Sequence, residues 1–466
     1  MGPRLIHEWD AELRSADPLR FPGYGPPAAA DESVRTGLAA FGDRRAVLVE
    51  CRFDHQGGTM GAVAGERLVR ALRRAVELRL PVVELVASGG ARLQEGMVSL
   101  VQMARTASAA RAHAASGLMS VAVYRSPTTG GVYASWASLV DLRAAEPGAV
   151  VGFGGPRVVA EVTGHWPPAT SHTAESAYRA GLVDAVVPAE EQFAWVRGAL
   201  GGPAPPLLPP PGRPVTPDPS NVPAEPWWIL ARARHRSRPS GVEWAAWLCD
   251  SWVELHGADP AVRAGLARVG GERVVVVAMD RHAGGDGAAR PRPAGYRLAQ
   301  RAVRLADRIG CPVLTLIDTP GAEPGPTAES DGVAQEIAGT LVAMAACRTP
   351  TVALCVGEGG SGGAMALGHA DRLLMLDGAA FSVIGPEAAS AILYRDSSHA
   401  RQLAADLRIT AADLSTLGLV DGVVPESGPG TVATVRAAVL DALATARIGD
   451  RDRRTATATA RALAGP

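Results

Sequence analysis

Two short apolar runs, each preceded by a proline and followed by a glycine turn, give the chain its clearest pattern. Residues 82–87 lead into Ser88-Gly89-Gly90-Ala91, and residues 313–317 lead into Asp318-Thr319-Pro320-Gly321-Ala322. Runs of this length and composition are typical of strands buried on both faces of a parallel sheet. We therefore predict a buried strand ahead of each turn.

Apolar residues upstream of each run recur at helical spacing. They are Leu68, Leu72, Ala75 and Leu78 before the first run, and Leu298, Ala302, Leu305 and Ile309 before the second. This periodicity predicts one helix ahead of each strand. Helices that alternate with buried strands indicate an α/β fold built from repeated βα units.

Further landmarks recur in the same order in both halves, which indicates a duplication. Gly130-Gly131 matches Gly362-Gly363, Gly155-Pro156 matches Gly385-Pro386, and Gly-Leu-Val-Asp at 181–184 recurs at 418–421. Between the halves, residues 201–226 contain 11 prolines, a composition that favours polyproline II. We predict a domain over 1–200, a linker over 201–226 and a domain over 227–466.

The composition excludes several classes of protein. With 46 basic and 47 acidic side chains among 466 residues, the chain lacks the basic excess of a nucleic-acid binder. All the basic residues are arginine, which excludes a lysine Schiff base and the lysine of a nucleotide P-loop.

The five cysteines and the apolar runs suggest where the protein works. The cysteines are scattered, which argues against a zinc ribbon or a disulfide framework and predicts reduced, mostly buried thiols. The sequence contains no signal-peptide pattern and no apolar run of about 18 residues. We expect a cytoplasmic protein without a membrane partner.

Each glycine pair is predicted to begin a helix. Gly130-Gly131 precedes a helix-compatible stretch over 132–143, and Gly362-Gly363 follows a strand over 351–356 and a loop over 357–361. The first N–H groups of a helix lack intrahelical partners, and the helix dipole favours negative charge there. The two pairs are therefore candidate oxyanion sites, although a tight turn or helix packing would also explain a single pair.

Side-chain catalysts are less well supported. The segment 359–363 matches the Gly-x-Ser-x-Gly spacing of a nucleophile elbow around Ser361, but a loop so rich in glycine matches it easily, and the first half has no equivalent serine. The ten histidines share no context, and the sequence contains no metal-ligand cluster. Backbone N–H groups are the better candidates.

Longer motifs resemble a known family. The first half is similar to the carboxyltransferase beta subunit of bacterial acetyl-CoA carboxylase in residues 17–21, 58–61, 88–96, 127–132, 145–147 and 152–158. The second half is similar to the alpha subunit of the same enzyme in residues 254–257, 295–297, 317–322, 357–364 and 382–387. The resemblance covers almost the whole chain apart from the linker and the C-terminal tail.

The resemblance implies a fused beta-alpha carboxyltransferase with two tandem crotonase-like (ClpP/crotonase) spiral domains of ββα units. It implies that carboxybiotin, presented by a separate biotin carboxyl carrier protein and made by a biotin carboxylase, supplies a carboxyl group to the α carbon of a short acyl-CoA such as acetyl-CoA. The enolate and the ureido anion of biotin would both be oxyanions. Because the cysteines of this chain cannot form a zinc ribbon, we expect no metal cofactor. The family's active site lies between two protomers, which implies a homodimer or a higher even oligomer.

The resemblance also assigns residues to these roles. Gly130 and Gly131 would hold the thioester oxygen, and Gly362, Gly363 and Ala364 would hold the ureido oxygen. The substrate-binding residues would be Gly89, Gly90, Ala91, Arg92, Gly321 and Gly360, of which the first four line the CoA side.

Three departures from the family leave other hypotheses open. The four-cysteine zinc ribbon is missing, the first hairpin is shortened around residues 46–50, and the stretch 281–293 is compressed and glycine-rich. The last two favour altered substrate use or a specialised pathway. One alternative is a biotin-independent decarboxylase of the malonate decarboxylase type. Another is a non-catalytic partner of a second carboxyltransferase, against which the intact glycine pairs argue.

Overall fold

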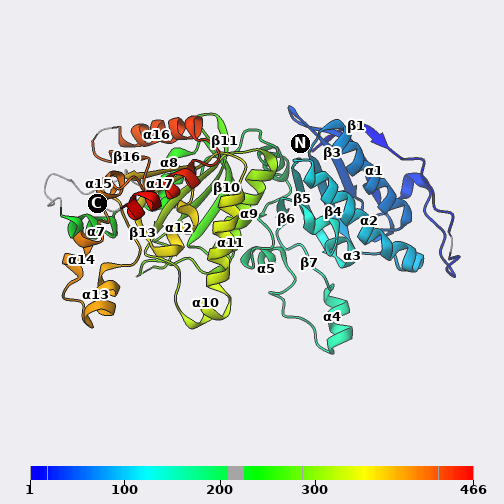
Figure 1. Cartoon of the computed structure of the whole chain (residues 1–466). Coiled ribbons are helices and arrows are strands. Elements are labelled where there is room, and N and C mark those ends of the chain that lie inside the picture. Colours follow the sequence, from blue (N-terminus) through cyan, green and yellow to red (C-terminus); the bar gives the residue numbers. More distant parts are fainter. Residues whose placement is uncertain (1, 18, 208–224, 286, 429, 465–466) are drawn as a thin grey trace. The chain divides into compact units, whose positions relative to one another are not determined.

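A computed structural model describes residues 2–17, 19–207, 225–285, 287–428 and 430–464. The chain divides into two compact units, Met1–Ala204 and Pro205–Pro466, which Figure 1 colours from blue to green and from green to red. Each unit is built on an eight-stranded sheet, which confirms the α/β prediction for both halves. Residues 208–224 of the predicted linker lie outside the described residues.

The N-terminal unit has a mixed sheet with the order β1-β2-β3-β4-β5-β6-β8, and β7 pairs with β5. Its strands are β1 (Arg4–Trp9), β2 (Val34–Phe41), β3 (Arg44–Cys51), β4 (Val82–Ser88), β5 (Ser120–Thr129), β6 (Leu142–Ala145), β7 (Val151–Gly152) and β8 (Ala185–Val186). Its α-helices are α1 (Ala62–Leu78), α2 (Gly96–Ala115), α3 (Gly130–Tyr133), α4 (Pro156–Thr163), α5 (Ala174–Arg179) and α6 (Gln192–Ala199).

The C-terminal unit repeats this order as β9-β10-β11-β12-β13-β14-β16, and β15 pairs with β13. Its strands are β9 (Ser251–Leu255), β10 (Val262–Val269), β11 (Glu272–Met279), β12 (Val313–Thr319), β13 (Thr351–Gly360), β14 (Arg372–Leu376), β15 (Ala380–Ser382) and β16 (Gly422–Val424). Its α-helices are α7 (Pro226–Ala233), α8 (Gly241–Leu248), α9 (Pro293–Ile309), α10 (Pro326–Ser330), α11 (Val333–Ala346), α12 (Ser361–Gly368), α13 (Pro386–Tyr394), α14 (Ala400–Asp406), α15 (Ala411–Thr416), α16 (Thr431–Thr445) and α17 (Asp450–Ala464).

The two predicted strands lie at the centres of the two sheets. All seven residues of β4 and all seven of β12 are buried, and each strand pairs in parallel with both of its neighbours. The helices predicted upstream are α1 and α9, whose apolar faces are buried. The sequence pattern therefore located the central layer of each unit correctly.

Two predicted local structures are wrong. The stretch 132–143 is not one helix, because α3 ends at Tyr133, a 3₁₀ helix spans Trp136–Leu139 and β6 begins at Leu142. Burial explains the change, since Trp136 is 1% exposed and β6 pairs with β5 inside the sheet. The predicted loop 357–361 is largely strand, because β13 continues to Gly360 and its last three residues pair with β15.

The first hairpin, which the sequence predicts to be shortened, keeps all its strand pairing. The strands β2 and β3 are antiparallel over their whole length, from Val34 opposite Cys51 to Phe41 opposite Arg44. A short connection at residues 42–43 is enough to reverse the chain. The sheet therefore keeps both strands without a longer hairpin.

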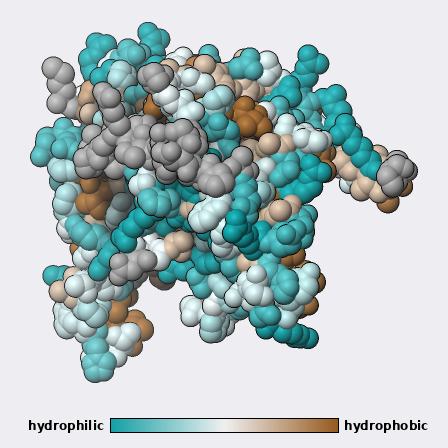
Figure 2. Space-filling model, turned by 90° about the vertical axis from the view of Figure 1, so that its left-hand side faces the viewer, coloured by the Kyte–Doolittle hydropathy of each residue, from teal (hydrophilic) through white to brown (hydrophobic). Residues whose placement is uncertain are grey.

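All five cysteines are free and buried, as predicted. Within the described part of the chain, no helix has both the length and the apolar composition of a membrane span. On the face shown in Figure 2, hydrophobic residues form separate small groups among hydrophilic ones, which is an ordinary composition for a protein surface.

Candidate active site

Two glycine turns of the N-terminal unit meet at the carboxyl ends of β4 and β5. These neighbouring strands are parallel, so the turn after Ser88 and the start of α3 at Gly130 lie side by side. A Cβ atom added to Gly90 would lie 3.0 Å from the Cα of Gly130 and 3.0 Å from the amide nitrogen of Gly131. Gly90 and Gly130 have φ angles of +108° and +61°, so glycine is required both for space and for conformation.

Some backbone N–H groups in these two turns already donate a hydrogen bond within the protein, whereas others have no acceptor in the part of the chain that the structure describes. We call an amide of the second kind open. The Gly130 N–H donates to the Phe153 carbonyl at 2.9 Å, and the Gly90 N–H donates to the Ser88 hydroxyl at 3.0 Å. Among the described residues, no acceptor is found for the N–H groups of Gly131 and Ala91. Gly130 therefore shapes the turn but does not offer its own N–H, which corrects the expectation that both glycines of the pair act as donors.

The open amides of Ala91 and Gly131 belong to neighbouring residues. The Ala91 Cβ lies 3.6 Å from the position that a Cβ of Gly131 would take. Gly89 contributes to the turn in a different way, because its N–H donates to the Gly57 carbonyl at 3.0 Å. Ala91 and Gly131 are thus the candidate donors to an oxyanion in this unit.

The C-terminal unit repeats the arrangement after β12 and β13. A Cβ atom at Gly360 would lie 2.2 Å from the Pro320 carbonyl carbon, so the turn after β12 packs directly on the end of β13. Gly321 has a φ angle of +124°. Gly362 has open space around its Cβ position, whereas a Cβ atom at Gly363 would lie 2.6 Å from the amide nitrogen of Ala322.

The structure aligns the two units one residue away from the alignment that the sequence predicts. The sequence matches Gly130-Gly131 with Gly362-Gly363, whereas the starts of the helices match Gly130 with Ser361. Gly130 opens α3 and Ser361 opens α12, and their φ angles are +61° and +58°. Gly131 therefore corresponds to Gly362, and Ala91 corresponds to Ala322. As at Ala91 and Gly131, we find no acceptor among the described residues for the N–H groups of Ala322 and Gly362.

This register leaves Gly363 and Ala364 outside the pair of corresponding amides. Gly363 is buried in close packing against the turn at Ala322. Ala364 is 0% exposed and does not line the neighbouring cavity. Gly363 lines this cavity, and no acceptor is found among the described residues for its N–H either, whereas Ala364 supports the first turn of α12. Ala322 lies in the motif at residues 317–322 but is not among the predicted site residues, and it takes the position of a donor.

A cavity of about 1010 Å³ opens in front of this second turn. Gly321, Ala322, Ser361, Gly362 and Gly363 form one part of its wall. The charged residues that line it are Arg234, Arg281, Arg290, Glu323, Glu329, Glu358 and Glu387. The residues that carry the open amides of the C-terminal unit therefore line a cavity that has charged side chains in its wall and is large enough for a small-molecule substrate.

Buried charges connect the two strands that carry these turns. Asp318 Oδ1 accepts hydrogen bonds from the Glu358 N–H and from Arg281, both at 3.2 Å. Arg234 donates to Glu358 Oε1 at 2.7 Å. Burial raises the pKa of Asp318 to about 6, although the charge of Arg281 opposes this shift. The cluster fixes the end of β12 against β13.

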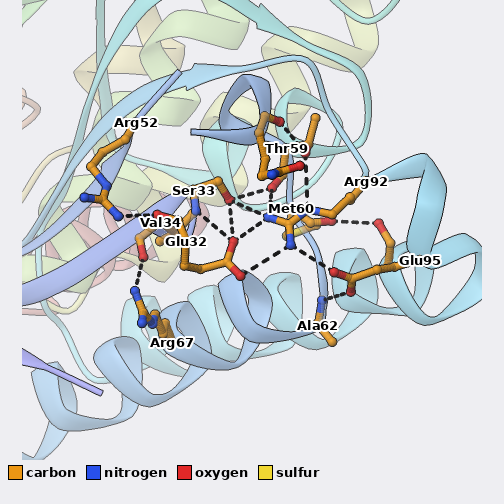
Figure 3. A network of polar contacts seen from close by, with 12 residues as sticks. Glu32, Ser33, Val34, Arg52, Thr59, Met60, Ala62, Arg67, Arg92 and Glu95 are labelled. Carbon is orange, nitrogen blue, oxygen red and sulfur yellow. Dashed lines mark hydrogen bonds and ion pairs between the residues drawn. The ribbon is translucent and has the colours of Figure 1, made fainter. Parts of the chain in front are cut away.

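Arg92 does not offer its guanidinium to a ligand, which corrects its predicted role on the CoA side. Its side chain is 1% exposed and forms ion pairs with Glu32 and Glu95. It also donates to the Ser33 hydroxyl at 2.9 Å and to the Thr59 carbonyl at 3.0 Å (Figure 3). Sequence alone could not separate this buried arginine from the many exposed ones.

The Arg92 network positions the turn that contains Ala91. Glu95 accepts a hydrogen bond from the Ala62 N–H, the first residue of α1, at 2.6 Å. The Arg92 N–H donates to the Met60 carbonyl, and the Met60 N–H donates to the Gly90 carbonyl. Arg92 is therefore a positioning residue, which ties the glycine turn to α1 and to the segment at Glu32.

Ser361 shows no sign of activation as a nucleophile. Its side chain is exposed, and within the described residues no histidine or carboxylate forms a hydrogen bond to its hydroxyl. A nucleophilic serine needs such a base within hydrogen-bond reach. The structure lends this hypothesis no support.

Comparisons with known proteins show which proteins the chain is similar to. Residues 223–452 match the family described as acetyl co-enzyme A carboxylase carboxyltransferase-like. The chain is 44% identical to the acetyl-coenzyme A carboxylase carboxyl transferase subunits beta/alpha of Salinispora arenicola, over 88% of this chain and 77% of the relative. It is 40% identical to a probable biotin-dependent acyl-coenzyme A carboxylase beta3 subunit of Mycobacterium tuberculosis, over 85% of this chain and 80% of the relative.

Solved structures support the fold. Transcarboxylase 12S, crystallised as a hexamer with methylmalonyl-coenzyme A bound, superposes with a TM-score of 0.77 at 21% identity, covering 96% of this chain and 88% of that chain. A single-chain, multi-domain long-chain acyl-CoA carboxylase superposes with a TM-score of 0.72 at 22% identity, covering 94% of this chain and 44% of that chain. The predicted crotonase-like fold is confirmed.

Proposed function

The chain belongs to the family of the acetyl-coenzyme A carboxylase carboxyl transferase subunits beta/alpha, and from this premise we propose that it transfers a carboxyl group from carboxybiotin to the α carbon of an acyl-CoA. Carboxybiotin on a separate carrier protein supplies the carboxyl group, and a biotin carboxylase regenerates it. A short acyl-CoA is the proposed acceptor, with malonyl-CoA as the product from acetyl-CoA.

One observation carries this proposal: two open pairs of backbone N–H groups occur at equivalent places in the two units. Ala91 and Gly131 form the first pair, and Ala322 and Gly362 form the second. Transfer of a carboxyl group to the α carbon requires negative charge first on the ureido oxygen of biotin and then on the thioester oxygen. Two separate donors of this kind meet that requirement, and each N–H typically lowers the barrier enough to change the rate by about a hundredfold or more.

The two pairs have different proposed ligands. In the N-terminal unit, Ala91 and Gly131 donate to the thioester oxygen of the acyl-CoA, and Gly89 and Gly90 leave room for the substrate. In the C-terminal unit, Ala322 and Gly362 donate to the ureido oxygen, and Gly321 and Gly360 allow the turn to approach closely. A cavity of about 1010 Å³ beside the second pair provides the space that a bicyclic ring needs.

The proposed partners follow from the chemistry and from the relatives. The acyl-CoA and the biotin carboxyl carrier protein are substrates that the chain must bind in turn. We propose a homodimer or a higher even oligomer working in the cytoplasm, in which each site combines the N-terminal unit of one protomer with the C-terminal unit of another. Light scattering combined with activity measurements tests this, because a fully active monomer contradicts it.

A direct assay tests the function. The purified protein is mixed with carboxylated carrier protein and a panel of acyl-CoA esters, and the products are identified by mass spectrometry. Formation of a carboxylated CoA ester that depends on the carrier supports the proposal. Decarboxylation of malonyl-CoA without biotin would contradict it, but the relatives, which are named as carboxyl transferases and biotin-dependent carboxylase subunits, lend that alternative no support.

A further inference from the structure

Arg290 stands out in the cavity of the C-terminal unit because no counterion for its charge is found in the part of the chain that the structure describes. Arg234 is paired with Glu358 and Glu387, and Arg281 is paired with Asp318. Arg290 also lines the cavity, yet within the described residues it forms no ion pair, and its only hydrogen bond is a donation to the Pro320 carbonyl at 3.2 Å. A guanidinium with one neutral acceptor has N–H groups left for a ligand.

The position of Arg290 is fixed by its own backbone neighbours. The Ala289 N–H donates to the Arg281 carbonyl at 2.8 Å, and the Pro291 carbonyl accepts from the Glu323 N–H at 3.0 Å. The Arg290 Nη1 atom lies 3.4 Å from the position that a Cβ of Gly321 would take. The guanidinium is therefore held beside the turn that carries the open amide of Ala322.

The cavity is not basic overall, so Arg290 must act at short range. Glu323 and Glu329 line the same cavity, and they oppose a general accumulation of anions. A bidentate hydrogen-bonded contact between a guanidinium and a carboxylate overcomes this opposition, because charge-assisted hydrogen bonds are short and strong. A planar carboxylate matches the fork of N–H groups, whereas a neutral carbonyl uses only one of them.

We propose that Arg290 is a substrate-binding residue that holds the carboxylate being transferred. This inference rests on the proposed function, and it adds a side chain to a site otherwise made of backbone N–H groups. The same contact serves carboxybiotin before the transfer and the malonyl product after it, since both carry a carboxylate. Acetyl-CoA lacks this group and gains nothing from Arg290.

Binding of two CoA esters separates this role from a structural one. Dissociation constants of malonyl-CoA and acetyl-CoA are measured by calorimetry for the wild type, Arg290→Gln, Arg290→Lys and the control Arg236→Gln. Arg236 is exposed, and it lines the adjoining pocket but not the cavity at Ala322, so the control removes the same charge nearby.

Arg290→Gln is expected to weaken malonyl-CoA binding by about tenfold to a hundredfold, the usual effect of losing a charged hydrogen bond, and to leave acetyl-CoA binding unchanged. Arg290→Lys keeps the charge without the fork and should fall between the wild type and Arg290→Gln. Arg236→Gln should behave as the wild type. Carboxyl transfer by Arg290→Gln should fall with an unchanged KM for acetyl-CoA.

Three results would overturn the proposal. The first is that Arg290→Gln binds malonyl-CoA as tightly as the wild type does. The second is that Arg290→Gln loses affinity for malonyl-CoA and acetyl-CoA equally. The third is that Arg236→Gln loses as much affinity for malonyl-CoA as Arg290→Gln does. If the wild type itself transfers no carboxyl group in the carrier-dependent assay, the proposed function fails and this inference fails with it. Melting temperatures of all variants identify any loss caused by unfolding, in which case Arg290→Lys decides the outcome.

Discussion

Ser361 in the C-terminal unit corresponds to Gly130 in the N-terminal unit. Ser361 begins the helix that follows β13 and Gly130 begins the helix that follows β5, and each has a left-handed backbone, with φ angles of +58° and +61°. This conformation costs a residue with a side chain about 1–2 kcal/mol. The turn therefore imposes the left-handed backbone on Ser361. The position of Ser361 at this turn does not by itself show that its hydroxyl takes part in catalysis.

Replacing Ser361 by glycine tests this interpretation. We expect Ser361→Gly to keep its carboxyl transfer rate within about twofold of the wild type, because the turn needs the left-handed backbone and not the hydroxyl. The free energy of unfolding should rise by up to about 1 kcal/mol as the strain is relieved. Steady-state kinetics and urea denaturation provide the measurements. A loss of activity of a thousandfold in a stable variant would instead identify Ser361 as a nucleophile.

Gly362 and Gly363 should respond differently to valine. At Gly362 no atom lies within 4 Å of the Cβ position, so valine fits the fold but fills the space in front of the open amide. We expect Gly362→Val to lose about a hundredfold in turnover or more with a nearly unchanged melting temperature. At Gly363 the Cβ position lies 2.6 Å from the Ala322 amide nitrogen, so Gly363→Val should lower the melting temperature.

A valine at Gly287 serves as the control for the Gly362 experiment. No atom lies within 4 Å of its Cβ position either, and it does not line the cavity at Ala322. Gly287→Val should keep full activity. Full activity of Gly362→Val in the same assay would remove the Gly362 N–H from the mechanism.

Arg92 should contribute to stability more than to CoA contact. Burial alone would raise the pKa of Glu32, but the hydrogen bond and charge of Arg92 lower it below its usual value. Arg92→Met leaves Glu32 and Glu95 buried without their cation, and we expect a loss of about 3–5 kcal/mol in the free energy of unfolding. Urea denaturation measures this loss.

The triple variant Arg92→Met, Glu32→Gln, Glu95→Gln provides the matched comparison. It removes the cation together with both anions, so part of the lost stability should return. An Arg92→Met protein as stable as the wild type would contradict the view that these buried ion pairs hold the turn in place.

Glu84 should make the protein less stable as the pH rises. This residue of β4 is fully buried, and burial, followed by the charge of Asp141, raises its pKa well above the usual value. The folded state therefore holds a proton that the unfolded state releases above its normal carboxyl pKa, and the free energy of unfolding falls as the pH rises between the two pKa values.

The variant Glu84→Gln removes this titration. We expect the melting temperature of Glu84→Gln minus that of the wild type to increase steadily from pH 5 to pH 8, because all other titrating groups contribute equally to both proteins. Thermal denaturation over that range provides the measurement. A difference that is constant with pH would show that Glu84 is already ionised in the folded state.

The sequence by itself determined the local order of elements in this protein. A run such as residues 82–87 can be buried on both faces because all its side chains except that of Glu84 are apolar. Burial raises the pKa of Glu84, so this carboxyl group holds its proton more strongly in the folded protein. The turns after β4 and β12 could be located because the glycines that the left-handed backbone requires at Gly90 and Gly321 are visible in the sequence. Local pattern also indicated the duplication, and the longer motifs indicated the family.

Only the tertiary structure decided which amides are open and which charges are buried. Whether the Gly130 N–H is occupied depends on Phe153, which the pairing of β7 with β5 brings next to it. The same holds for Arg92, whose burial depends on Glu32, which is distant in sequence. Hydrogen bonds and ion pairs of this kind join segments that the folded sheet brings together, so no local pattern of residues specifies them.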